Sequence, residues 1–222
     1  MKAIIFGGIG TIANTSYLQR RAFNAAFEQL SVKWHWSEEE YRSLLVQAGG
    51  EARITQYNKR YPGLPEGVTA SQVHKLKTTL FHDFMTETDL PLRSGVHWVI
   101  QQAKANNIKL AFATTTSRKN IEILLKAAKL QQITFDIISD RSLVSVSKPD
   151  PEVYQYCLKK LNVTSNDCIS IEDADSGLKA SVNAGIRCIA FPNEFTSKHN
   201  YDNAIERVDD LRKAECLNAF VA

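Results

Sequence analysis

Short apolar runs bounded by turn residues occur at the start of the chain and repeatedly in its second half. Most of their residues are β-branched, aromatic or small and apolar, which is typical of strands buried on both faces of a parallel sheet. We therefore expect five buried strands, over residues 3–6, 108–113, 136–138, 168–171 and 188–191.

Helical spacing of apolar residues fills the intervals between these strands after residue 90. The spacing predicts helices over residues 95–106, 118–130, 150–161 and 175–184. Pro151 suits the first turn of a helix, and Gly185 suits a helix stop. Alternating strands and helices predict an α/β doubly wound parallel sheet that is covered on both faces.

Residues 15–88 contain several helical patterns and no convincing strand. A capping box of Ser37 and Glu40 predicts the start of a helix that runs through residue 46. Apolar spacing predicts three more helices, over residues 17–30, 50–61 and 70–85. We therefore expect a core domain formed by residues 1–14 and 89–222, with an α-helical domain inserted between its first and second strands.

Composition narrows the classes of partner and environment. Lysine and arginine number 27 against 24 aspartate and glutamate, and the basic residues are scattered, which argues against a nucleic-acid surface. No stretch predicts a signal peptide or a membrane span, so we expect a cytoplasmic protein with no membrane partner. The four cysteines lack Cys-x-x-Cys spacing, so we expect them to pack in the core of a protein from a reducing compartment. They are Cys157, Cys168, Cys188 and Cys216.

Ligands of open parallel sheets bind at the carboxyl ends of the strands, so the residues there are candidates for a site. Thr114 and Thr115 follow the second predicted strand, where hydroxyl and amide groups before a helix can hold a phosphate. Lys148 precedes another predicted helix, where its ammonium can reach a phosphate. The adjacent acids Glu172 and Asp173 follow a further strand and suit a hard cation such as Mg²⁺, held jointly with substrate oxygens.

Each of these residues also has a simpler interpretation. Thr116 or Ser117 would cap the next helix, and Lys148 alone would be a surface lysine. Asp173 or Asp175 would likewise cap a helix. Taken one at a time the simpler interpretations are favoured, but an ordered set of hydroxyl, lysine and paired acids at strand ends favours a phosphate site.

This ordered set resembles the haloacid dehalogenase superfamily, and the similarity spans almost the whole chain. Thr114 matches the hydroxyl of the second motif and Lys148 the lysine of the third. Glu172 and Asp173 match the acids of the fourth. The inserted helices resemble the cap of the beta-phosphoglucomutase-like branch. Four stretches look closest to the CbbY-type sugar bisphosphate phosphatases: residues 21–27, 34–36, 90–96 and 113–117.

The first motif departs from this resemblance. Members of the superfamily read Asp-x-Asp-Gly-Thr after the first strand, and the resemblance implies that the first aspartate attacks phosphorus while the second exchanges protons. Gly7 and Ile9 occupy those positions, and the Gly-Thr that follows keeps the alignment in register. Neither residue supplies a nucleophile or a proton. The resemblance also places a metal ligand at position 7, so we expect Glu172 and Asp173 to form a weakened Mg²⁺ site.

The cap contains a second departure, together with the expected contacts to the distal end of a substrate. Gln19 stands where relatives often carry histidine, and its amide can hydrogen-bond a sugar hydroxyl but cannot act as a base. Lys77 matches a lysine that holds a remote phosphate in related mutases. Arg20 and Arg53 are further candidates for a second phosphate, with ordinary exposed charge as the alternative.

Two functions from different classes agree with these residues. In the favoured one, phosphoryl transfer through an aspartate is lost, and the protein binds a phosphorylated sugar or inorganic phosphate between core and cap. It would then act as a sensor, a scaffold or the partner subunit of another protein. In the alternative, the chain is a weak Mg²⁺-dependent sugar phosphate phosphatase that uses Glu172 or Asp173 with a metal-bound water.

Overall fold

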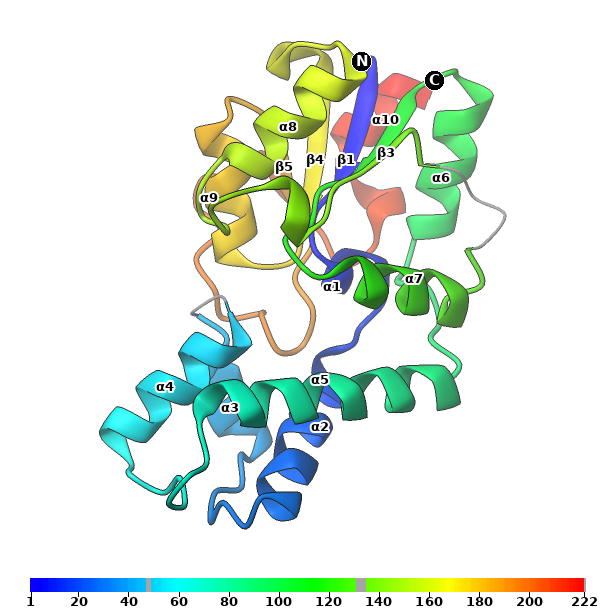
Figure 1. Cartoon of the computed structure of the whole chain (residues 1–222). Helices are drawn as coiled ribbons and strands as arrows, with labels where there is room; N and C mark the ends of the chain where they lie inside the picture. The colour runs from blue at the N-terminus through cyan, green and yellow to red at the C-terminus, as the bar shows by residue number, and fades with distance from the viewer. Residues whose placement is uncertain (47–48, 131–134, 222) are drawn as a thin grey trace. The chain divides into compact units, whose positions relative to one another are not determined.

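The structure is a computed structural model that describes residues 1–46, 49–130 and 135–221 (Figure 1). The chain divides into two compact units, which we call the core unit and the helical unit. The core unit comprises Met1–Asn14 and Leu90–Ala222, and the helical unit comprises Thr15–Asp89. The boundary where the chain returns to the core unit lies between residues 89 and 90, one residue later than expected.

The core unit is built on a parallel sheet with the strand order β3-β2-β1-β4-β5-β6. The four longest strands are almost entirely buried because apolar residues occupy both of their faces. The strands are β1 (Ala3–Phe6), β2 (Lys109–Phe112), β3 (Ile137–Ile138), β4 (Cys168–Glu172), β5 (Arg187–Ala190) and β6 (Glu206–Arg207).

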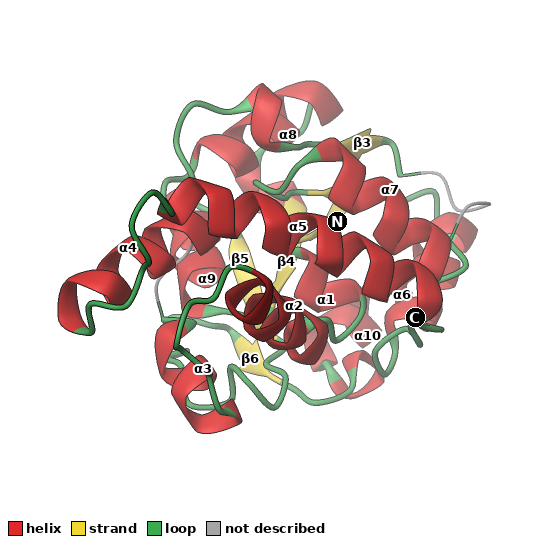
Figure 2. Ribbon diagram, turned by 60° about the horizontal axis from the view of Figure 1, so that its bottom comes forward, coloured by secondary structure: helices red, strands yellow, loops and turns green. Residues whose placement is uncertain are grey.

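Helices cover both faces of this sheet, which confirms the predicted doubly wound fold (Figures 1 and 2). On one face, α8 and α9 contribute Tyr154 and Ala180 to a buried cluster with Ala3 and Ile5 of β1. On the other, α6 contacts β2, and α10 contacts α6. The helices of the core unit are α1 (Ile9–Ile12), α6 (Val96–Ala105), α7 (Arg118–Ala127), α8 (Glu152–Leu161), α9 (Asp175–Asn183) and α10 (Glu215–Val221).

Local signals explain where several of these elements begin and end. Ser117 caps α7 by accepting a hydrogen bond from the backbone of Asn120, so Ser117 and not Thr116 is the cap. Gly185 has a φ of 77° just after α9, a conformation that glycine adopts readily at a helix end. Ala174 precedes α9 without a side-chain cap, so neither Asp173 nor Asp175 has the simple capping role.

The helical unit consists of α2 (Ser16–Gln29), α3 (Glu38–Leu44), α4 (Gly50–Arg60) and α5 (Ala70–Glu87). As predicted, Ser37 caps α3 by accepting a hydrogen bond from the backbone of Glu40. Contacts of α5 with α2 and α4 hold the unit together. Its core is rich in aromatic residues because Phe23, Phe27 and Trp36 are fully buried against one another.

Two further expectations concern the environment of the protein. In residues 1–46, 49–130 and 135–221, no helix has the length and apolar character that crossing a membrane requires. All four cysteines are free, and three of them are buried. Cys157 and Cys168 lie in the buried cluster that α8 and α9 form with β1, and Cys188 lies in a second apolar cluster, so these three contribute to core packing.

Candidate functional site

The register of the central strands brings the candidate residues of the core unit to one edge of the sheet. Phe6 at the end of β1 lies opposite Phe112 of β2 and Ile171 of β4. The backbone of Gly7 donates to Ile171 at 2.9 Å, and that of Ala113 donates to Phe6 at 2.7 Å. The residues that follow β1, β2 and β4 therefore surround a common point.

Glu172 and Lys148 form a buried ion pair at this point. Lys148 Nζ donates to Glu172 Oε1 at 2.6 Å and to the carbonyl of Ala113 at 2.9 Å. Tyr154 of α8 donates its hydroxyl to the same Oε1 at 2.5 Å. The side chains of Lys148 and Glu172 are 9% and 2% exposed, so water does not screen their attraction as it does at a surface. Burial and the neighbouring Glu172 raise the pKa of Tyr154, so its hydroxyl stays a donor.

The Glu172 carboxylate lies in the space that a side chain at position 7 would fill. A Cβ placed on Gly7 would overlap its carboxylate carbon and both of its oxygens. Gly177 of α9 borders the same carboxylate from another side, since a Cβ there would overlap it too. Glycine at position 7 thus removes a side chain and leaves room for the end of Glu172.

Asp173 lies beside Glu172, partly buried against the loop that contains Asn193. Asn193 Nδ2 donates to Asp173 Oδ2 at 3.3 Å, and Tyr201 donates its hydroxyl to the Asp173 carbonyl at 2.6 Å. Burial, and then the charge of Glu172, raises the pKa of Asp173 to about 6. Two adjacent acids in such a place cost electrostatic energy unless cations balance them.

Arg93 is a cation close enough to Asp173 to interact with its charge. Its guanidinium donates to the carbonyls of Gly10, Phe191 and Pro192 at 2.7–2.8 Å and stacks on the Phe191 ring at 3.5 Å. Burial lowers the pKa of Arg93, while Asp173 opposes that shift. Arg93 was not among the predicted site residues, although an arginine in a mostly apolar stretch was an available signal. Tyr154 was also missed, because a tyrosine on the apolar face of a helix resembles ordinary core.

The two predicted threonines lie close to Lys148 at the end of β2. Thr114 directly follows Ala113, whose carbonyl accepts from Lys148. The Thr114 hydroxyl is buried and accepts from the backbone of Thr116 at 3.2 Å, and its amide donates to Ser139 at 3.0 Å. Thr115 is partly exposed. The structure thus brings Thr114, Lys148 and Glu172 together, with Ser139 as an additional neighbour.

The acids at this edge do not fit a resident Mg²⁺ ion as they are arranged. In the part of the chain that the structure describes, no three His, Cys, Asp or Glu side chains group closely enough to hold a metal. Gly7 and Ile9 provide no side-chain oxygen. The Oε1 atom of Glu172 already accepts bonds from Lys148 and Tyr154, whereas a hard cation needs several anionic oxygens turned toward it.

In the helical unit, a second buried lysine joins two of the predicted cap residues. Lys77 Nζ donates to Gln19 Oε1 and lies 4.6 Å and 4.9 Å from the ring centroids of Phe23 and Phe81. Burial, and then the charge of Arg53, lowers the pKa of Lys77 to about 7. Gln19, Lys77 and Arg53 therefore form one cluster. Arg53 is itself buried and donates to the carbonyl of Leu44 at 2.9 Å.

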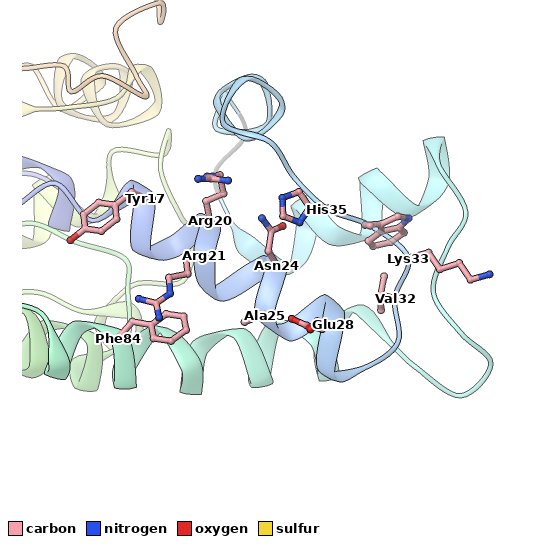
Figure 3. A pocket seen from close by; sticks show the side chains of 11 residues that line it. Tyr17, Arg20, Arg21, Asn24, Ala25, Glu28, Val32, Lys33, His35 and Phe84 are labelled. Atoms are coloured by element: carbon pink, nitrogen blue, oxygen red, sulfur yellow. The ribbon is translucent and has the colours of Figure 1, made fainter.

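Arg20 lines a separate groove of the helical unit, with a volume of about 890 Å³ (Figure 3). Its guanidinium donates to the carbonyl of Trp36 at 3.3 Å. Arg21, the next residue along α2, stacks on Phe84 of α5 at 3.9 Å in the same groove. Arg20 thus differs from the other three predicted cap residues, because it binds the Trp36 carbonyl and lines a groove away from the contact of Gln19 with Lys77.

Comparison with known proteins agrees with this geometry. Residues 4–191 match the model of the haloacid dehalogenase-like hydrolases. The chain is similar to Protein CbbY of Cereibacter sphaeroides, with 38% identity over 95% of this chain and 93% of that protein. It is also similar to beta-phosphoglucomutase of Bacillus subtilis, with 27% identity over 84% of this chain and 81% of that protein.

Solved structures extend the likeness to three dimensions. Two crystal structures of CbbY from Rhodobacter sphaeroides have a TM-score of 0.87 and 38% identity, and each match covers 95% of this chain and 94% of the solved chain. One is a complex with phosphate, and the other is a mutant in complex with xylulose-(1,5)bisphosphate. Members of the matched family generally use Mg²⁺. The predicted resemblance is confirmed, and this chain belongs to the haloacid dehalogenase-like hydrolase family.

Proposed function

We propose that this chain binds phosphate or a phosphorylated sugar and does not transfer the phosphoryl group. The observation that carries the proposal is the set of side chains at the edge of the sheet around Gly7. A lysine and a threonine hydroxyl suited to an anion lie there, at Lys148 and Thr114, but positions 7 and 9 carry no carboxyl group. Recognition of an anion needs the lysine and the hydroxyl, whereas an aspartyl-phosphate mechanism needs the carboxyl groups.

The ligand class follows from the charges and from the relatives. Solved CbbY structures hold phosphate and a sugar bisphosphate, which supports the same class for this chain. Gln19 and Lys77 of the helical unit are suited to a sugar hydroxyl and a second phosphate. We therefore favour a small sugar phosphate over nucleic acid or a membrane surface, and a role as a sensor or as a regulatory subunit of another protein.

Weak metal-assisted hydrolysis is the rival function. It would use Glu172 or Asp173 with water on Mg²⁺. The bonds from Lys148 and Tyr154 to Glu172 argue against it, because they engage an oxygen that the cation would need. A Mg²⁺ site on these two acids is accordingly proposed to be weak.

Isothermal titration calorimetry tests the binding proposal. Inorganic phosphate and a sugar bisphosphate are titrated into the wild-type protein and into Lys148→Met, with Lys213→Met as a control on a surface lysine paired with Asp209. Saturable heat is expected for wild type and for Lys213→Met, and loss of binding of at least about tenfold is expected for Lys148→Met. If neither ligand gives saturable heat with the wild-type protein, the proposal is wrong.

A further inference from the structure

We infer that Glu172 is an internal competitor of the ligand at the core site, held there because position 7 is glycine. This inference rests on the proposed function and concerns how the same site is regulated. An anion that binds Lys148 competes with the Glu172 carboxylate for the same ammonium. The free protein thus holds its own anion where the ligand belongs.

Three observations place Glu172 in this role. Its carboxylate accepts from Lys148 Nζ at 2.6 Å, and an incoming phosphate would use the same ammonium. It fills the space of a position-7 side chain, so any side chain larger than hydrogen at Gly7 would collide with it. The carboxylate also accepts a hydrogen bond from the Tyr154 hydroxyl at 2.5 Å, which holds it toward α8.

Competition of this kind lowers the affinity for an anion without changing the residues that contact it. Binding-competent molecules are those in which Glu172 has turned away, and the apparent dissociation constant rises as their fraction falls. Glu172 also repels an anion by its charge. A change that moves Glu172 away from Lys148 should therefore strengthen phosphate binding, although it adds no contact to phosphate.

Gly7→Ala is a direct test because the added methyl group enters the space of the Glu172 carboxylate. The atoms that it meets are the end of a flexible side chain, and Gly7 does not have a positive φ, so alanine adds no backbone strain. Gly8→Ala is the matched control. A Cβ there would meet Asp173 Oδ1 at 3.7 Å, which is an ordinary contact.

Glu172→Gln is a second test that does not depend on steric displacement. It keeps the size of the side chain and removes its charge, so Lys148 becomes available to an anion. This variant guards against a failure of Gly7→Ala to fold, and circular dichroism establishes the folding of each variant.

Inorganic phosphate is titrated by calorimetry into the wild-type protein and the three variants, with a chelator present so that no divalent cation contributes. We expect Gly7→Ala and Glu172→Gln to bind phosphate at least about tenfold more tightly than wild type, and Gly8→Ala to match wild type. If the wild type binds and folded Gly7→Ala and Glu172→Gln bind no more tightly, the competitor role is overturned while the proposed function stands. If neither the wild type nor any variant binds phosphate, the competitor role is overturned, and the sugar bisphosphate titration described above decides the proposed function.

Discussion

The two units each bury a lysine, and they stabilise it in different ways. In the core unit, Lys148 pairs with the carboxylate of Glu172 at 2.6 Å. In the helical unit, Lys77 donates to the neutral amide of Gln19 and lies close to two aromatic rings, with the cation of Arg53 nearby. Burial penalises a charge unless an opposite charge compensates it. In the core site, the protein itself supplies the counter-ion of the buried lysine. In the helical unit, Lys77 needs an anion from a ligand, or it loses its proton.

Removing the core lysine should have the largest effect. Lys148→Met leaves the buried Glu172 carboxylate without its cation, which we expect to lower the free energy of unfolding by about 3–5 kcal/mol. Urea denaturation followed by circular dichroism measures the change. Lys213→Met, which breaks an exposed ion pair with Asp209, should leave stability unchanged within error. Equal effects of the two substitutions would show that the Lys148 pair is not buried as described.

Removing the lysine of the helical unit should have an effect of opposite sign that depends on pH. Burial lowers the pKa of Lys77 from 10.5 to about 7, so between these values the unfolded chain binds more protons than the folded one. Folded wild-type protein therefore gains stability as pH rises through this window, by at most about 1.4 kcal/mol per pH unit. Lys77→Met has no such dependence, so its advantage over wild type should be largest near pH 6 and shrink toward pH 9.

Denaturation of Lys77→Met and wild type at pH 6, 7, 8 and 9 measures that difference. Comparing the two proteins at each pH cancels the titration of the cysteines and other groups that they share. A difference that stays constant across the series would mean that Lys77 keeps an ordinary pKa and that its surroundings are more polar than the structure indicates.

The amide partner of Lys77 should matter least. Gln19→Leu removes the oxygen that accepts from Lys77 and keeps a side chain of similar size, so we expect a loss of about 1 kcal/mol at neutral pH. Thermal unfolding can detect a change of this size. In the double variant Gln19→Leu with Lys77→Met the loss should disappear, and its persistence would contradict the assigned pairing.

The fold was largely predictable from the sequence, because buried parallel strands carry long apolar runs that alternate with helical patterns. The exceptions have physical reasons. β6 (Glu206–Arg207) is two residues long and polar, so no apolar run marks it. Gln19 and Lys77 lie 58 positions apart in the sequence, and only the resemblance to the haloacid dehalogenase superfamily predicted that both belong to one site.

The site was predictable as a set of strand ends but not as a set of contacts. Spacing placed Thr114, Lys148 and Glu172 at one edge of the sheet. It could not show that Glu172 turns into the space left by Gly7, because that depends on side-chain conformation. Arg93 stands out as an arginine in a mostly apolar stretch, but its partners could not be predicted, because they are backbone carbonyls of distant residues.

The measurement that tests the central claim most directly is phosphate release from a sugar bisphosphate with Mg²⁺ present, by wild type and by Gly7→Asp with Ile9→Asp. If the protein has lost the chemistry and kept the binding surface, the wild type should release no more phosphate than a mock purification. The folded double variant should then release phosphate at least about 10³-fold faster than the wild type. Release by wild type that Asp173→Ala abolishes would contradict the account and establish metal-assisted hydrolysis instead.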